Sequence, residues 1–96
     1  MKIGLVQYSP VWEDKDTNKE KITSLLKEDN SDVDLLIFPE MTLTGFSMRS
    51  EIYAEEIEGE SLAYFASLAE KFECDIIAGI IEHRSGIYFN LSLIHI

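Results

Sequence analysis

Three almost wholly apolar runs constrain the fold of this chain more than any other feature of its sequence. They cover residues 3–8, 33–38 and 76–81, and each is long enough for one β-strand. Apolar residues that are continuous rather than alternating are typical of strands buried on both faces, as in parallel sheets. Each gap between the runs has room for a helix, the usual crossover between parallel strands. The sequence therefore predicts an α/β fold.

Two of the intervening segments have the periodicity of amphipathic helices. The first helix is expected to open near residues 14–16, whose carboxylates can cap free amides, and to fade in the polar loop 28–32. Its predicted inward side chains are Asn18, Ile22, Leu25 and Leu26. The second helix is expected to begin with Ser61 as N-cap. Its apolar stripe consists of Leu62, Phe65, Ala66, Ala69 and Phe72.

The remaining segments complete the predicted order β-α-β-loop-α-β-β. Residues 50–60 are expected to form a surface connection with room for one helical turn. Residues 82–86 supply turn residues, and a fourth strand from residue 87 is expected to pair back antiparallel. Two helices can shield only one face of such a sheet. We therefore expect either an incomplete domain, which is the favoured interpretation, or a face that meets a second chain.

The charge balance narrows the classes of partner. The chain has 8 Lys and Arg against 18 Asp and Glu, a net charge of −10, and its basic residues are scattered. Binding to a phosphate backbone needs clustered basic residues, so no nucleic-acid partner is expected. The apolar start turns polar at Gln7, and no apolar run has the length of a membrane span. A single cysteine cannot form an internal disulfide. We expect a cytoplasmic protein without a membrane partner.

Glu40 is the outstanding candidate for chemistry. It follows Pro39 at the carboxyl end of the second apolar run, which is where open α/β sheets place their sites. The next residues, up to Met48, are too irregular for a helix and too apolar for a solvated loop. We expect the neighbouring apolar side chains to remove Glu40 partly from water and make it a better proton acceptor. These neighbours are Phe38, Met41, Leu43 and Phe46.

The other reactive side chains are interpreted as structural or incidental. Cys74 lies between Glu73 and Asp75, whose charges disfavour a thiolate, and it precedes a strand at the end away from Glu40. His83 and His95 have no evident partner in the sequence. Gly79 is interpreted as a position where two backbones approach closely.

The residues from Phe38 to Phe46, Phe-Pro-Glu-Met-Thr-Leu-Thr-Gly-Phe, resemble the amino-terminal part of the nitrilase superfamily, the carbon–nitrogen hydrolases. Trp12 ahead of Asn18, the Ile-Ile-Ala-Gly segment that ends at Gly79 and the Tyr-Phe-Asn segment that ends at Asn90 agree with the same family in order. Residues 40–48 are most similar to the ω-amidase branch, whose members release ammonia from 2-oxo acid amides such as 2-oxoglutaramate.

The resemblance implies the amino-terminal portion of a four-layer αββα sandwich with a Glu-Lys-Cys triad. The family's cysteine attacks the carbon–nitrogen substrate, its lysine stabilises the oxyanion, and its glutamate moves protons. Glu40 matches that glutamate, the general base, whereas no residue of this chain matches the lysine or the cysteine. The resemblance therefore implies a small amide substrate, no cofactor and no metal. We expect the whole protein to be a homodimer or higher oligomer, and this chain alone to be inactive.

The end of the chain departs from the family pattern. The family has a small residue after the asparagine, whereas this chain has Leu91, and residues 91–96 match one reading frame of a common sequencing adapter. We expect residues 1–90 to be the partial hydrolase domain and residues 91–96 to be a non-native tail. The alternative for residues 91–96 is an ordinary apolar strand.

Two other functions agree with parts of the sequence. A small acidic α/β binding or receiver-like signalling module would also place an acid at a strand end, but it needs an acidic pair after the first strand, where this chain has Gln7-Tyr8-Ser9. A non-catalytic partner protein could instead cap another subunit through its bare sheet face.

Overall fold

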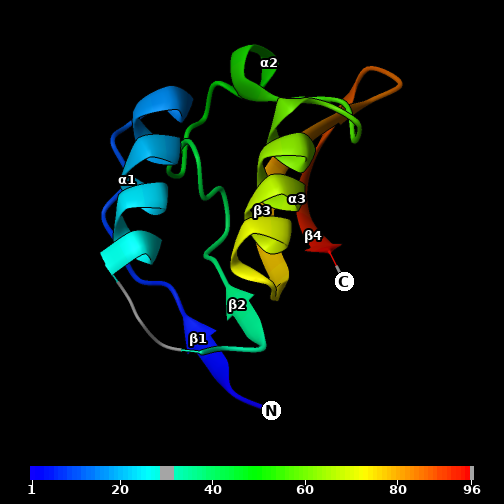
Figure 1. Cartoon of the computed structure of the whole chain (residues 1–96). Coiled ribbons are helices and arrows are strands. Elements are labelled where there is room, and N and C mark those ends of the chain that lie inside the picture. The colour runs from blue at the N-terminus through cyan, green and yellow to red at the C-terminus, as the bar shows by residue number, and fades with distance from the viewer. Residues whose placement is uncertain (29–31, 96) are drawn as a thin grey trace.

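The computed structural model describes residues 1–28 and 32–95 and contains one four-stranded sheet beside two long helices (Figure 1). The strands are β1 (Ile3–Leu5), β2 (Leu35–Ile37), β3 (Asp75–Arg84) and β4 (Ile87–His95). The helices are α1 (Lys15–Glu28), α2 (Ser50–Tyr53) and α3 (Glu60–Phe72). The predicted α/β class and the predicted order of elements are confirmed, and α2 is the single helical turn expected between residues 50 and 60.

The sheet is mixed, with the strands in the order β1-β2-β3-β4. β1 pairs parallel with β2, and β2 parallel with β3, so that Ile3 lies opposite Leu35 and Leu36 opposite Ile76. β4 returns antiparallel along the whole length of β3, with Ile81 opposite Asn90. Parallel pairing brings the carboxyl ends of β1 and β2 to one edge of the sheet, where the segments after them can meet.

α1 begins as the sequence predicts but buries a narrower stripe. The carboxylate of Asp14 accepts hydrogen bonds from the backbone nitrogen of Thr17 at 3.1 Å and from its hydroxyl at 2.8 Å, which caps the first turn. Asn18, Ile22 and Leu26 are buried. The expectation for Leu25 was wrong, because this side chain is 38% exposed.

α3 starts two residues earlier than predicted, because its N-cap is residue 59 and not residue 61. Gly59 occupies the N-cap position without a side-chain hydrogen bond, so Ser61 is not the cap. Ser61 lies instead inside the first turn, where its backbone nitrogen and its hydroxyl both donate to the carboxylate of Glu55. At the other end, Glu73 adopts a left-handed conformation with φ of 53°, which terminates the helix before β3.

The turn between β3 and β4 is shorter than predicted. Residues 82–84 belong to β3 and not to the turn, which consists of Ser85 and Gly86 alone. Both have positive φ, 51° and 76°, as required in the two-residue turns whose twist matches that of antiparallel strands. Because the turn is tight, the strands extend to its edge.

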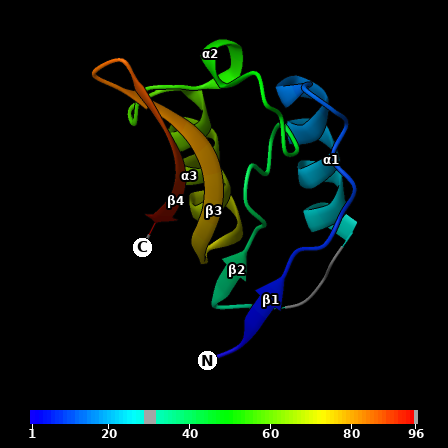
Figure 2. The ribbon, with the colours of Figure 1, turned by 180° about the vertical axis from the view of Figure 1, so that it is seen from behind.

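Both long helices cover the same face of the sheet. The Tyr64 hydroxyl of α3 donates to the Lys19 carbonyl of α1 at 2.8 Å, and Ile22, Phe65 and Ile76 belong to one core cluster. Seen from behind, β3 and β4 stand in front of α3 (Figure 2).

The opposite face of the sheet is apolar and open. Ile3 is 53% exposed, Leu5 77% and Ile94 66%. Ile3 and Leu5 belong to the first apolar run of the sequence, and a continuous apolar run carries apolar residues on both faces of a sheet.

Residues 91–95 continue β4, which is the alternative interpretation of this segment, and Leu93 is buried against β3. An apolar strand pairs in this way whatever its origin, so the prediction of a non-native tail stays a prediction.

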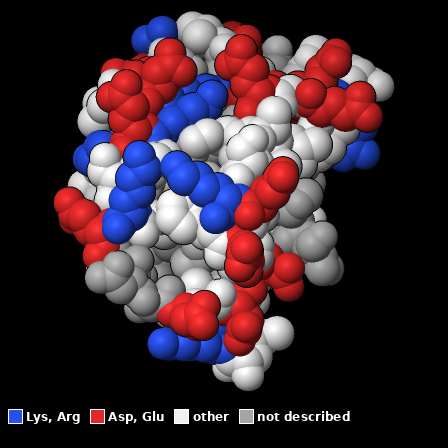
Figure 3. Space-filling view, viewed as in Figure 1, with Lys and Arg blue, Asp and Glu red and all other residues white. Residues whose placement is uncertain are grey.

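Within residues 1–28 and 32–95, no helix combines the length and the apolar character needed to cross a bilayer. On the face that carries the helices, acidic and basic side chains are interspersed (Figure 3).

Candidate active site at the carboxyl end of β2

Glu40 lies just beyond β2, where proline ends the regular strand. The Phe38 backbone nitrogen still donates to the Ile77 carbonyl at 2.8 Å, but Pro39 has no N–H to continue the ladder. Pairing with β3 then resumes in an irregular form. The Gly79 nitrogen donates to the Pro39 carbonyl at 3.3 Å, and the Thr42 nitrogen donates to the Gly79 carbonyl at 3.0 Å. The backbone on both sides of Glu40 is therefore bonded to β3.

Gly79 provides the surface on which the Glu40 backbone rests. A Cβ atom at position 79 would lie 2.5 Å from the Glu40 Cα and 3.0 Å from the Met41 nitrogen, closer than real Cβ contacts. Only glycine leaves room for this approach, which confirms the interpretation of Gly79 as a point of close backbone packing.

The residue after Glu40 has a left-handed backbone. Met41 has φ of 45°, and its carbonyl accepts hydrogen bonds from the nitrogens of Thr44 at 3.2 Å and Gly45 at 2.9 Å. Gly45 also has positive φ, 74°. A non-glycine residue in this conformation costs free energy and persists only where its surroundings fix it, as happens at functional sites.

The segment between β1 and α1, together with α1 itself, holds the backbone of this loop in place through hydrogen bonds. Three consecutive carbonyls of the Glu40 loop each accept a hydrogen bond from this segment or from α1. The pairs are the Tyr8 hydroxyl to Thr42, the Asn18 side-chain nitrogen to Leu43 at 2.7 Å, and the Glu13 backbone nitrogen to Thr44 at 2.9 Å. Burial, reinforced by nearby Tyr64, raises the pKa of Tyr8 to about 12, so its hydroxyl keeps the proton that it donates.

Asn18 is the centre of this network. It is fully buried, and besides Leu43 its amide bonds both backbone groups of Val11, donating to the carbonyl at 2.8 Å and accepting from the nitrogen at 2.7 Å. A buried polar side chain on the inward stripe of a helix needs such partners. The sequence pattern placed Asn18 on that stripe but assigned it no partner, although its polarity was the available signal.

Glu55 attaches the next segment of chain to the scaffold. Its carboxylate accepts from the Lys15 ammonium at 2.5 Å and from Ser61, and its backbone bonds to β3 at Ile81 and His83. Burial alone would raise the pKa of Glu55, but the hydrogen bonds from Lys15 and Ser61 outweigh it and hold that pKa below its ordinary 4.5. The sequence did not predict this cluster, because Lys15 lies 40 positions from Glu55 and Ser61 was expected to cap its own helix.

The side chain of Glu40 is exposed and not shielded as predicted. The expectation of a partly dry carboxylate was wrong for this chain, because Phe38 and Leu43 are buried on the helix side and Phe46 is 65% exposed. Glu40 does have one defined side-chain partner among the described residues. The side-chain nitrogen of Asn90, on β4, donates to its carboxylate at 3.0 Å.

A groove of about 220 Å³ adjoins this pair. Asn90, Met41 and Ile81 contribute to its walls, so it reaches both the residue after Glu40 and the partner of its carboxylate. The other lining residues are Ser47, Met48, Ser50, Tyr88 and Phe89. Glu40 is therefore exposed at the rim of a groove and not on an isolated convex surface.

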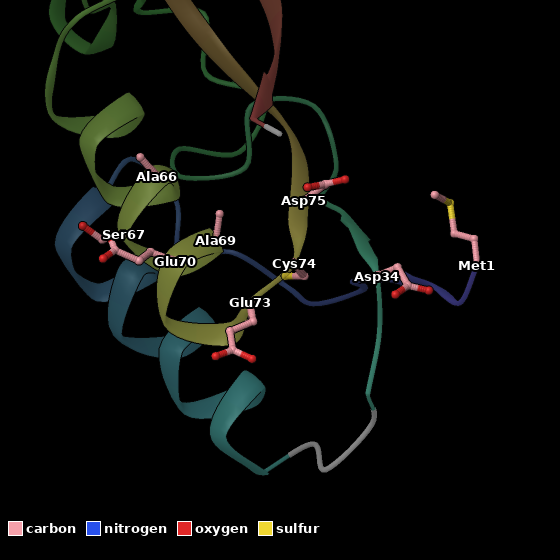
Figure 4. Close-up of a pocket in the computed structure, with 9 residues that line it drawn as sticks. All are labelled: Met1, Asp34, Ala66, Ser67, Ala69, Glu70, Glu73, Cys74 and Asp75. Carbon is pink, nitrogen blue, oxygen red and sulfur yellow. The ribbon is translucent and has the colours of Figure 1, made fainter.

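Cys74 lies away from this site, as predicted. It precedes β3 and lines a cavity of about 810 Å³ at the amino-terminal edge of the sheet, together with Asp34 and Asp75 (Figure 4). Burial, and then the charge of Asp75, raise the pKa of the Cys74 thiol. The thiol is therefore held in its unreactive protonated form, and this cavity does not contain Glu40.

The histidine prediction needs one correction. His83 lies in β3 and not in a turn, and its ring stacks on Tyr88 with centroids 5.2 Å apart. The side chain of His95 lies outside the described residues. In the part of the chain that the structure describes, no group of three His, Cys, Asp or Glu side chains is arranged to hold a metal ion.

Residues 2–94 match the sequence profile of the Carbon-nitrogen hydrolase family. The match covers nearly the whole chain, and the acid of the motif stands where a parallel strand ends. The chain belongs to the carbon–nitrogen hydrolase family, the nitrilase superfamily.

Individual relatives agree with this assignment. The chain is 31% identical over 93 residues to a protein described as "Hydrolase in agr operon" from Staphylococcus aureus, and covers 36% of it. It is 28% identical over 96 residues to an (R)-stereoselective amidase from a Pseudomonas species, and covers 35% of it. These matches take in 94% and 98% of the chain.

The fold agrees with a solved structure as well. XC1258 from Xanthomonas campestris, a CN-hydrolase superfamily protein with an arsenic adduct in its active site, superposes with a TM-score of 0.89 at 29% identity. The match covers 98% of this chain and 36% of that one. The four strands and their helices are thus a part of the carbon–nitrogen hydrolase fold, and the chain spans about a third of the length of these relatives.

Proposed function

We propose that this chain supplies the proton-transferring glutamate, Glu40, of an amidase whose lysine and cysteine lie outside these 96 residues. The observation that carries the proposal is the fixed position of Glu40 at the carboxyl end of β2 in a chain of the carbon–nitrogen hydrolase family. The reaction is hydrolysis of an amide by water to a carboxylic acid and ammonia.

The roles follow from the chemistry of such a site. A cysteine thiolate attacks the amide carbon, a lysine stabilises the oxyanion, and ammonia leaves to give a thioester. Glu40 accepts the thiol proton, passes a proton to the departing nitrogen, and then takes a proton from the water that hydrolyses the thioester. An acceptor at the rim of a groove can serve all three transfers, because it reaches the reacting atoms without moving the backbone.

Residues 40–48 resemble the ω-amidase branch, so a 2-oxo acid amide such as 2-oxoglutaramate is the proposed substrate.

We propose further that the whole protein is cytoplasmic and forms a homodimer or a higher oligomer. Light scattering on the purified protein tests the oligomeric state.

The test begins with the coding sequence around this chain. The proposal expects the reading frame to continue into a lysine and then a cysteine, each just beyond a further apolar strand. That extended protein should release ammonia from 2-oxoglutaramate, and the 96-residue chain alone should not. A frame that closes after Ile96, or an extended protein that releases no ammonia from any amide, would contradict the proposal. Ammonia from simple amides only would keep the amidase and overturn the ω-amidase assignment.

A further inference from the structure

We propose that Asn90 is the positioning residue of Glu40, holding its carboxylate in one orientation at the groove. This inference rests on the proposed function of Glu40 and adds a residue to which the sequence pattern gave no role. The contact itself is the 3.0 Å hydrogen bond from the Asn90 side-chain nitrogen to the Glu40 carboxylate.

The chemistry of the two side chains fixes which one donates this hydrogen bond and which one accepts it. A carboxylate only accepts hydrogen bonds, whereas the asparagine amide carries two N–H donors. Hydrogen bonds to a charged acceptor are stronger than those between neutral groups. An N–H group of Asn90 can therefore hold the Glu40 carboxylate in the orientation shown, with the other carboxylate lone pairs left free to accept a proton.

The strand β3 supports both residues of this hydrogen bond, the loop that carries Glu40 and the strand that carries Asn90. The Glu40 backbone rests on Gly79 of β3, and Asn90 lies directly across from Ile81, two residues further along β3. Residues two apart on a strand share a face, and so do residues directly opposite on a neighbouring strand. β3 thus fixes the distance between the base of the Glu40 side chain and its partner.

Position matters here because Glu40 is exposed. An exposed glutamate has three rotatable side-chain torsions and no packing to select among their rotamers. Asparagine has only two, and the backbone of Asn90 is held in a ladder of nine pairs with β3. A short side chain on a rigid strand is suited to orient a long one on a loop, and Asn90 and Met41, the residue after Glu40, both line the groove.

The first test is spectroscopic and uses the 96-residue chain. The side-chain amide proton signals of Asn90 should move as the solution is acidified through the range in which carboxyls titrate. In Glu40→Ala this movement should vanish. The buried Asn18 amide reports whether each sample is folded, because its partners are backbone groups. Asn90 signals that do not move, or that move equally in Glu40→Ala, would overturn the inference.

The second test measures turnover in the extended protein. Asn90→Ala should lower kcat about tenfold with little change in KM, because orientation of the base is lost while substrate binding remains. Asn90→Asp has the same size but places a like charge beside Glu40, so it should lower kcat further. Ile87→Ala is the control on the same strand, since Ile87 is 57% exposed, does not line the groove and should leave kcat unchanged.

The two readouts separate the possible failures. If the Asn90 signals respond as expected but the extended protein releases no ammonia, the contact stands and the proposed function fails. If ammonia is released and Asn90→Ala turns over like the wild type, the proposed function stands and the positioning role fails. Where a variant does not fold alone, the same amide signals are recorded in the extended protein.

Discussion

Gly79→Ala tests whether close packing against β3 holds the Glu40 backbone in place, because it adds a single methyl group at the point of contact. The new Cβ would lie 2.5 Å from the Glu40 Cα, whereas ordinary contact begins at 3.4 Å, so the two backbones must separate by about 0.9 Å, the difference between the two distances. The clashing atoms belong to the backbone and cannot rotate away. Replacing a strand glycine by alanine ordinarily stabilises by about 0.5–1 kcal/mol, but overpacking costs about 1–3 kcal/mol. The steric cost wins, and we expect a net loss of about 1–2 kcal/mol.

The assay is urea unfolding followed by circular dichroism, combined with amide hydrogen exchange. Exchange at Thr42 should accelerate, because its nitrogen donates to the Gly79 carbonyl. Gly86→Ala is the control. Its Cβ meets no atom within 4 Å, but its φ of 76° makes alanine cost about 1–2 kcal/mol. It should therefore lower stability similarly while leaving exchange at Thr42 unchanged. A Gly79→Ala chain as stable as the wild type, with Thr42 protected, would refute the reasoning.

Three further predictions concern the scaffold. Asn18→Ala should destabilise the chain by about 3 kcal/mol in urea unfolding, because it leaves the buried Leu43 carbonyl and two part-buried backbone groups of Val11 without partners, and a loss below about 1 kcal/mol would contradict the network. The folded pKa of Glu55 lies below 4.5, so its stabilising effect is present above the unfolded pKa and lost as pH falls through the folded pKa. Glu55→Gln should thus show a smaller loss of unfolding free energy on acidification than the wild type, and identical losses would count against it. Cys74 should be alkylated more slowly at neutral pH than a free thiol and faster in Asp75→Asn, and a fully reactive Cys74 would show that the pKa of its thiol is not raised.

Much of the fold could be predicted because the strong signals are local. The apolar runs predicted the three parallel strands, although one face of the sheet is open in this chain, and the acid after Pro39 lies at the carboxyl end of β2 as expected. The errors fall where tertiary contacts override local preference. Ser61 is a good N-cap by residue type, but it lies inside the first turn of α3, where its backbone nitrogen and its hydroxyl donate to Glu55, which precedes the helix. Residues 82–84 contain polar residues typical of turns, but pairing with β4 extends them as strand.

The sequence predicted one residue of the candidate site, Glu40, but not how the residues around it are arranged. Glu40 stood out through its motif, yet its partner Asn90 lies 50 positions away and meets it only because β4 folds back on β3. The expected shielding of Glu40 failed because the regular strand ends before Pro39, so that Glu40 does not follow the buried Phe38 into the core although the two residues are only two positions apart.

The two other functions have readouts of their own. A receiver-like module would bind Mg²⁺ or an acyl phosphate as the isolated chain. A protein that caps another subunit through its open sheet face would form a stable, soluble complex in size-exclusion chromatography. Either result would favour that function over amide hydrolysis for this chain.

The most direct test of the central claim, that Glu40 transfers the protons in amide hydrolysis, is ammonia release by the extended protein with Glu40 and with glutamine in its place. Glutamine keeps the size and the hydrogen-bonding oxygen but cannot accept a proton. We expect Glu40→Gln to lower kcat by about 10²–10⁴-fold with an unchanged circular dichroism spectrum. A folded Glu40→Gln protein that releases ammonia within a few-fold of the wild-type rate would contradict the account.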